Sequence, residues 1–156
     1  MKPESVTIKN LESAFAGESM AHIKYLYFAK VCRAAGDIES AKVFEETAAQ
    51  EIQHAFGHLD LLFPATELTP ARALEMAIAG ETYEYTEMYP QFRHLAEQEG
   101  NTKAVAEMDG QIAESQEHAQ RFQNTLTTAA KRFAALARVE ERHANQYRAT
   151  LAKIAA

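Results

Sequence analysis

The chain has 156 residues, 47% of them hydrophobic and 24% charged, which is the composition of one soluble domain with a hydrophobic core. Its net charge of −6 argues against a nucleic-acid partner, because binding to phosphates needs a basic surface. The single cysteine, Cys32, excludes an intrachain disulfide and a tetrathiolate metal centre. No apolar segment has the length of a signal peptide or of a membrane span, so we expect a cytoplasmic protein with no membrane partner.

The abundance of Ala, Glu, Gln and Leu, with only 6 Gly and 4 Pro, predicts an all-α fold. The first helix is expected over residues 8–34, and Gly36 suits the left-handed conformation that follows a helix end. Asp37 can cap a second helix over residues 38–63, which has to end before Pro64. The amino-terminal half is therefore expected to be a helical hairpin.

The carboxyl-terminal half starts at Thr69 and Pro70, a pair typical of an N-cap and a first helical turn, and is helical in composition from there on. Two turn signals compete to divide it. One is Gly100 in "EQEGN", and the other is the Asp-Gly pair at 109–110 in "EMDGQ".

A short internal repeat indicates that both halves have the same architecture. "AFAGES" at residues 14–19 recurs as "AIAGET" at residues 77–82, so that Glu18 and Glu81 take matching places. Each half is then one helical hairpin, and two hairpins make a four-helix bundle. We expect a single domain over residues 1–156, whose third and fourth helices form an extended hairpin.

Two Glu-x-x-His motifs carry the first sign of chemistry. Glu51 and His54, like Glu140 and His143, stand three residues apart, which on a helix places both side chains on one face. Mostly apolar residues flank them at i±3 and i±4, so these faces are expected to be buried. Carboxylates in the two repeated segments complete the set of candidate ligands: Glu18, Glu81 and Glu84.

Five carboxylates together inside a bundle would cost several kcal/mol per ion unless they were protonated or bound to cations. Two divalent cations nearly cancel their charge. Carboxylate oxygen and imidazole nitrogen suit iron or manganese, and the absence of thiolates disfavours structural zinc. The residues therefore predict a centre of two divalent metal ions, which are iron, manganese or a mixed pair.

Each candidate also has an ordinary interpretation. A single Glu on a helix is more often a solvated surface residue than a ligand, and we place His22, His58 and His94 in that class, as exposed or hydrogen-bonded histidines. The methionines and phenylalanines are expected to fill the core. A helical interaction module with vestigial ligands is disfavoured, because every ligand type is present on four predicted helices.

Four segments match a known pattern: "NLESAFAGESMAHIKYLYFA", "VFEETAAQEIQHA", "AIAGETYEYTEMYPQF" and "ARVEERHANQY". Together they resemble the di-iron domain of the rubrerythrins, in the ferritin-like superfamily. The resemblance extends over nearly the whole chain and implies a di-iron enzyme that reduces hydrogen peroxide. The alternative is an iron-handling protein that oxidises ferrous iron with dioxygen.

The resemblance also implies a role for each matching residue. It implies Glu18 and Glu81 as terminal carboxylate ligands and Glu51 and Glu140 as bridging carboxylates. It implies His54 and His143 as the imidazole ligands. Glu84 is implied to be a carboxylate that one iron exchanges with a histidine as the redox state changes, and it is our candidate proton donor to the departing oxygen. Tyr25 and Tyr89 match tyrosines that hydrogen-bond the ligand carboxylates. Because the cysteine count excludes a rubredoxin-like module, we expect an external electron donor, such as a rubredoxin-like protein or a reductase.

Two pairs compete to complete the site. Glu114 and His118 would serve if the earlier turn were used, and Glu140 and His143 if the later one were used. We favour the later pair because it has the i, i+3 spacing, and because the 25 residues from His118 to His143 are about seven helical turns, which keeps the helix face. His118 is then expected on a solvated or partner-facing surface. The projecting hairpin is expected to be stabilised in a homodimer, with a helix-swapped dimer as one form.

Overall fold

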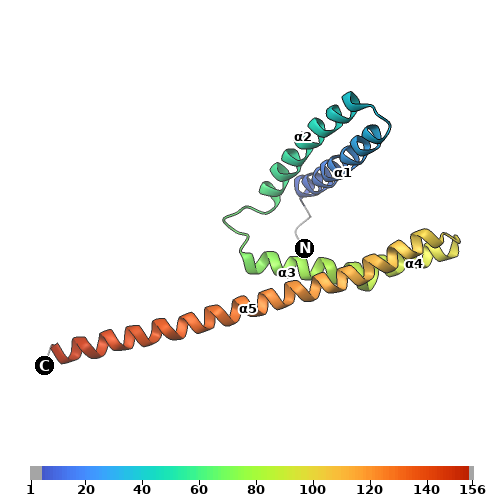
Figure 1. Ribbon diagram of the computed structural model, residues 1–156. Coiled ribbons are helices and arrows are strands. Elements are labelled where there is room, and N and C mark those ends of the chain that lie inside the picture. The colour runs from blue at the N-terminus through green and yellow to red at the C-terminus, as the bar shows by residue number, and fades with distance from the viewer. Residues whose placement is uncertain (1–4, 155–156) are drawn as a thin grey trace. The chain divides into compact units, whose positions relative to one another are not determined.

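The computed structural model describes residues 5–154, which are helical throughout apart from short connections and contain no strand. The chain divides into two compact units, residues 1–69 and 70–156. Each unit is a helical hairpin (Figure 1). No helix within the described range is long and apolar enough to cross a membrane. The all-α class is therefore confirmed, with the paired helices that the bundle prediction requires.

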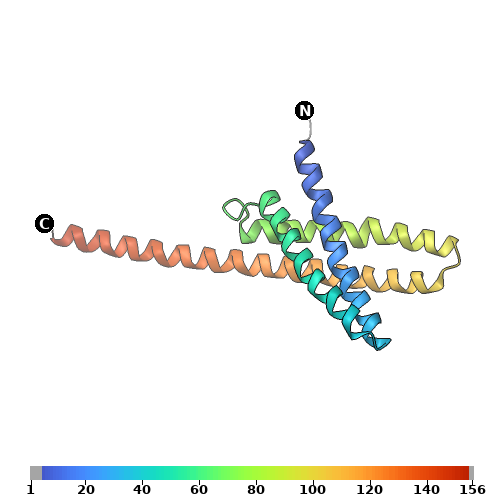
Figure 2. The same cartoon turned by 90° about the horizontal axis from the view of Figure 1, so that it is seen from above.

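The amino-terminal hairpin consists of α1 (Val6–Ala34) and α2 (Ile38–Leu62), which lie side by side (Figure 2). Gly36, with φ of 85°, makes the reversal between them. The Asp37 carboxylate then accepts a hydrogen bond from the backbone N–H of Ser40 at 3.0 Å and caps α2. Both signals act as the sequence predicted, and the helix limits differ from the predicted ones by one or two residues.

Small residues bring α1 and α2 together. Ala41, Ala48 and Ala55 repeat every seven residues along α2 and are 0–2% exposed. A spacing of seven is about two helical turns, so the three methyl groups form one stripe along the helix. Ala29 of α1 is the other fully buried residue of this hairpin within the described range. The close approach of the two helices thus depends on the absence of bulk at these positions.

The carboxyl-terminal hairpin starts with three helical segments in continuous succession, α3 (Pro70–Tyr83), η1 (Glu84–Met88) and α4 (Tyr89–Gln98). The five residues of η1 are π-helical, and the N–H of Tyr89 donates to the carbonyl of Glu84, five residues back. Pro90 explains the wider turn, because it has no N–H to donate and its ring crowds the carbonyl four residues earlier. Glu84 therefore lies at the start of a local irregularity of the helix.

The turn of this hairpin lies at Gly100 and Asn101, so the prediction of a turn at Asp109-Gly110 is wrong. Gly100 has φ of 70°, and the Asn101 side chain accepts a hydrogen bond from the N–H of Ala104 at 3.1 Å. Asp109 instead pairs with Arg93 of α4, Nε to Oδ1 at 2.5 Å, and the helix continues through both Asp109 and Gly110. Good turn chemistry was present at both places, and packing selected the first.

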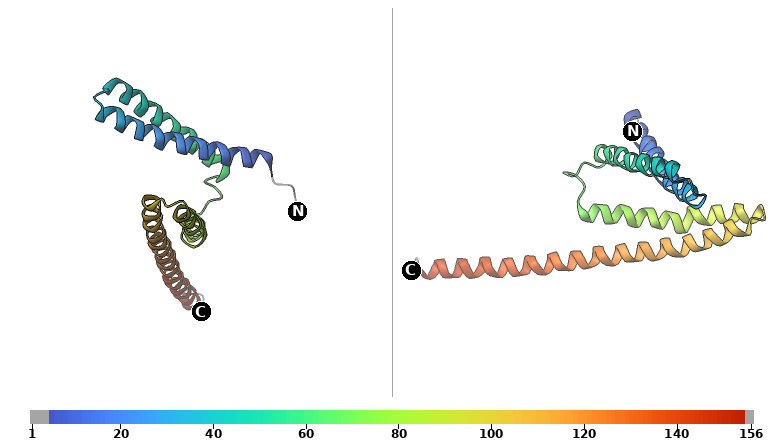
Figure 3. Two further views of the ribbon diagram at one scale, coloured as in Figure 1. Left: turned by 90° about the vertical axis from the view of Figure 1, so that its right-hand side faces the viewer. Right: turned by 45° about the horizontal axis from the view of Figure 1, so that its top comes forward.

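The last helix, α5 (Thr102–Ile154), has 53 residues and runs antiparallel to α3 and α4 (Figure 2). It extends well past the beginning of α3, as Figure 3 shows. Along its first half, residues facing α3 and α4 are buried or half-buried, with Ser115 and Ala119 the most enclosed. Half-burial recurs as far as Ala129, and residues 130–138 are all exposed. The extension of this hairpin thus belongs to one continuous helix, α5.

Candidate metal centre

The amino-terminal hairpin brings together three of the predicted ligands, Glu18 from α1 and Glu51 and His54 from α2. One ligand atom from each lies within 4.8 Å of the others. His54 Nδ1 is 3.0 Å from Glu51 Oε2 and 3.8 Å from Glu18 Oε2. The first pair follows from the i, i+3 spacing on α2, whereas Glu18 is added by the packing of α1 on α2.

The environment of this cluster favours the charged carboxylate of Glu51. A hydrogen bond with the Glu18 carboxyl, and then one with His54, lowers the pKa of Glu51 below its ordinary value of 4.5, while partial burial raises it. The Glu51 side chain is 16% exposed, that of Glu18 31% and that of His54 58%. The cluster is therefore shielded on the Glu51 side and open on the His54 side.

The carboxyl-terminal hairpin forms a second group around Glu81 and Glu84. His118 Nδ1 of α5 lies 3.4 Å from Glu81 Oε1, and Ser115 Oγ donates a hydrogen bond to Glu84 Oε2 at 3.0 Å. Ser115 is 3% exposed. The turn at Gly100 places His118 opposite Glu81, and its side chain is 51% exposed, so the expected solvated position is combined with a contact that was not expected.

Tyr89 belongs to the same hairpin and is half-buried next to this group. Burial raises its pKa above the ordinary value of 10.0, and neighbouring carboxylates raise it further: Glu84, Glu107 and Glu81. The phenol therefore keeps its proton at neutral pH and can act as a hydrogen-bond donor.

Glu140 and His143 lie in the extension of α5. His143 Nδ1 is 3.8 Å from Glu140 Oε2. The side chain of His143 is 54% exposed and that of Glu140 is 69% exposed. In this arrangement α5 brings Ser115 and His118, and not this pair, to Glu81 and Glu84. Their role as ligands stays a prediction.

The other singled-out residues have ordinary surroundings. His22 Nδ1 donates to the carbonyl oxygen of Ala48 at 2.7 Å, which confirms it as a hydrogen-bonded histidine. The ring of Tyr25 packs on Phe44, with centroids 5.9 Å apart. Hydrogen bonding of Tyr25 to a ligand carboxylate stays a prediction.

Two features of the site were not predicted from the sequence, the hydroxyl of Ser115 beside Glu84 and the π-helical turn. Pro90 within a helical segment was the signal for the turn. For Ser115 the signal was its position three residues before His118, where the resemblance expects a Glu, but its place in the site depends on which turn closes the hairpin.

The donor chemistry of both groups fits a pair of iron ions. Clustered carboxylates with one imidazole, in the absence of thiolates, form an oxygen-rich set typical of non-haem iron and manganese. Without a cation, the carboxylates of Glu18 and Glu51 would face each other with ligand atoms within 4.8 Å, which favours cation binding.

A family model described as Rubrerythrin matches residues 9–126. The chain is 39% identical over 130 residues to the rubrerythrin of Nitratidesulfovibrio vulgaris, and 41% identical over 130 residues to that of Porphyromonas gingivalis. It is 37% identical over 129 residues to the nigerythrin of Nitratidesulfovibrio vulgaris. This chain belongs to the rubrerythrin family.

These matches cover 76%, 76% and 74% of this chain, and 68%, 64% and 63% of the three relatives. The chain thus corresponds to about two thirds of their length. Membership of the rubrerythrin family establishes a non-haem di-iron protein of the oxidoreductase type, as the resemblance implied. The family match includes Ser115 and His118, whereas Glu140 and His143 follow its last residue.

Proposed function

We propose that this protein reduces hydrogen peroxide by two electrons at a di-iron centre, with electrons from an external donor such as a rubredoxin-like protein or a reductase. The observation that carries the proposal is the cluster of Glu18, Glu51 and His54 on a scaffold of the rubrerythrin family. Family membership alone leaves the oxidant open, since a ferritin-like di-iron site can also react with dioxygen.

The proposed ligands are those that the sequence singled out. The amino-terminal hairpin supplies Glu18, Glu51 and His54, and the carboxyl-terminal hairpin supplies Glu81 and Glu84. A Glu-x-x-His motif completes the set, with Glu140 and His143 as its members. His118, 3.4 Å from Glu81, is the imidazole that the observed arrangement offers in their place.

Iron held by these residues would supply the two electrons and the Lewis acidity that cleavage of the O–O bond needs. The protein contributes proton transfer and orientation. Glu84 carries a proton to the oxygen that leaves as water, and the Ser115 hydroxyl at 3.0 Å holds its Oε2. Tyr89 stays protonated because its pKa is raised, so it can orient a neighbouring carboxylate. Glu51 holds the ring of His54 through the 3.0 Å contact to Nδ1.

The metal assignment is tested by anaerobic titration with ferrous iron. Wild-type protein should hold about two ions per chain, the number that the pooled carboxylate charge requires. Glu51→Gln should hold fewer, because the variant keeps the shape of the side chain and loses its charge. The matched control is Glu46→Gln, the same change at an exposed position of α2. Equal loading of the two variants would contradict the assignment.

The oxidant is tested by rapid mixing of the diferrous protein with peroxide or with dioxygen. Peroxide should oxidise it much faster, and steady turnover should need an added reductase or rubredoxin-like donor. A faster reaction with dioxygen would favour the iron-oxidase alternative, in which the same residues bind metal.

A further inference from the structure

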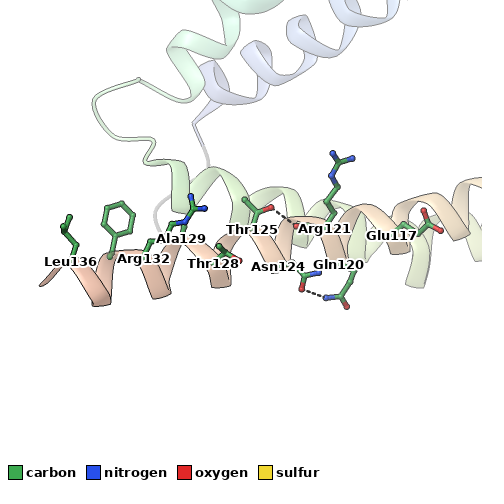
Figure 4. Close-up of a pocket in the computed structure, with 10 residues that line it drawn as sticks. Glu117, Gln120, Arg121, Asn124, Thr125, Thr128, Ala129, Arg132 and Leu136 are labelled. Carbon is green, nitrogen blue, oxygen red and sulfur yellow. Dashed lines mark hydrogen bonds between the residues drawn. The ribbon is translucent and has the colours of Figure 1, made fainter. Parts of the chain in front are cut away.

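The extension of α5, residues 130–154, is called the C-terminal arm here. It carries five large hydrophobic side chains that are 56–78% exposed: Phe133, Leu136, Tyr147, Leu151 and Ile154. Five such residues on one exposed helix are unusual unless a partner covers them. A hollow reaches onto the arm, and its lining residues come from α5 alone, between Glu117 and Leu136 (Figure 4).

The apolar side chains of the arm continue the face by which α5 packs in its own hairpin. In the paired half, this face runs through Ser115, Ala119, Phe122 and Leu126, all buried or half-buried. The next apolar residues follow at helical spacing: Ala129, Phe133, Leu136, Tyr147 and Leu151. One face of one helix is therefore used for packing in its first half and exposed in its second.

The arm also repeats the sequence of the paired half. "ESQEHAQRFQNTL" at residues 114–126 aligns without gaps with "VEERHANQYRATL" at residues 139–151, a shift of 25 residues. Four positions are identical: His118 and His143, Ala119 and Ala144, Thr125 and Thr150, Leu126 and Leu151. Phe122 corresponds to Tyr147. Because 25 residues are about seven helical turns, each residue has its counterpart on the same face.

The two copies of the repeat differ at a position that bears on metal binding. Ser115, whose hydroxyl contacts Glu84, corresponds to Glu140. A serine hydroxyl satisfies a carboxylate without changing the charge of the site, whereas a glutamate adds a ligand oxygen and a negative charge. The arm is thus a second version of the segment facing Glu81 and Glu84, with both members of the Glu-x-x-His motif.

The arm cannot take that place within its own hairpin while α5 is one helix. A shift of 25 residues along a helix is about 37 Å at 1.5 Å per residue. The segment with Ser115 already lies against η1. Because α5 begins directly after the turn at Gly100, no loop residues are left that could let α5 slide along its own hairpin.

We infer that the C-terminal arm docks on the carboxyl-terminal hairpin of a second copy of this chain, bringing Glu140 and His143 to that copy's Glu81 and Glu84. The arm there takes the place that the second copy's own residues 114–126 hold in the structure. The inference rests on the proposed two-metal function. In each centre, Glu140 and His143 would then be the ligands that the partner copy supplies. The exchange is reciprocal, so two chains form two equivalent centres.

The balance between the two arrangements depends on the cation. Within residues 114–126, the repeat supplies the same imidazole and the apolar counterparts Ala144, Tyr147 and Leu151. The pair of Arg93 with Asp109 is lost, because position 134, the counterpart of 109, is Ala134. A third carboxylate beside Glu81 and Glu84 is unfavourable alone and favourable around a divalent cation. Metal therefore favours the exchanged dimer, and the metal-free chain favours the contact of Ser115 with Glu84.

Complementation between two defective variants tests which copy supplies the ligands. Glu84→Ala and Glu140→Ala should each retain less Mn²⁺ than wild type after desalting. When they are unfolded and refolded together, mixed dimers should contain one wild-type centre and one doubly defective centre. Retained Mn²⁺ should then exceed the mean of the separate variants by up to about a quarter of the wild-type amount, since about half of the dimers are mixed and one of the two centres in each is wild type. No gain on mixing would show that the ligands come from one chain and would overturn the inference.

Sedimentation velocity with Mn²⁺ tests the docking face. Leu151→Lys should abolish the dimer, because Leu151 lies on the apolar face of the arm. Ala149→Lys introduces the same charge two residues away on the opposite face and should leave the dimer intact. Equal effects of the two changes would overturn the inference.

The same measurements separate this inference from the proposed function. Wild-type metal binding by Glu140→Ala would overturn the role of the arm and leave the di-metal function in place. Wild-type protein that dimerises through Leu151 but retains neither Mn²⁺ nor ferrous iron would overturn the proposed function and support the docking.

Discussion

The position of the second hairpin turn can be tested by replacing two glycines with alanine in the metal-free protein. Gly100 has φ of 70°, in the left-handed region. A residue with a Cβ pays about 1–2 kcal/mol in that region. No atom lies within 4 Å of a Cβ built at Gly100, so crowding adds nothing to this cost. Gly100→Ala should therefore lower the free energy of unfolding by about 1–2 kcal/mol.

Gly110 is the internal control, because it lies inside α5 and its added Cβ also meets no atom within 4 Å. Alanine is favoured over glycine in a helix interior by about 0.8–1.0 kcal/mol. Gly110→Ala should therefore raise the free energy of unfolding by up to about 1 kcal/mol. The two variants should move in opposite directions.

Urea unfolding followed by circular dichroism measures both changes, with the free energy extrapolated linearly to water. For a chain of this length, each kcal/mol also shifts the melting temperature by about 2–4 °C. If Gly110→Ala destabilised the protein and Gly100→Ala had no effect, the turn would lie at Asp109-Gly110, and the reasoning from the observed backbone would be refuted.

Two further predictions concern the amino-terminal hairpin. Ala48→Leu should destabilise the protein by about 1–3 kcal/mol in urea unfolding, because Ala48 is 0% exposed between α1 and α2. Ala49→Leu, on the exposed side, should have little effect, and similar losses would contradict the packing. A side-chain hydrogen bond from Arg33 lowers the pKa of Glu45 below 4.5, so their pairing stabilises the fold above that pH and is lost as pH falls through the lowered pKa. Glu45→Gln should therefore be less stable than wild type at neutral pH, with the difference vanishing in acid, and a difference that grew in acid would contradict it.

The local signals in the sequence predicted most of the helix limits. Gly36, Asp37, Pro64 and Pro70 act through their own backbone and capping chemistry, which neighbours in the sequence decide. The contact of Glu51 with His54 was predictable for the same reason, because residues three apart on a helix meet whatever the helix packs against. Glu18 lies beside them because α1 packs on α2.

Tertiary structure alone decided how the carboxyl-terminal half is paired. Gly100 and Asp109-Gly110 both have good turn chemistry, and the sequence rule preferred the one that the structure does not use. The choice is not local, because it depends on which part of α5 fits against α3 and α4. The 25-residue repeat makes this harder to predict, since residues 114–126 and 139–151 present the same helix face after about seven turns. The sequence by itself therefore determined the helices and the ligand types, and only packing decided that Ser115 and His118 stand beside Glu84 and Glu81.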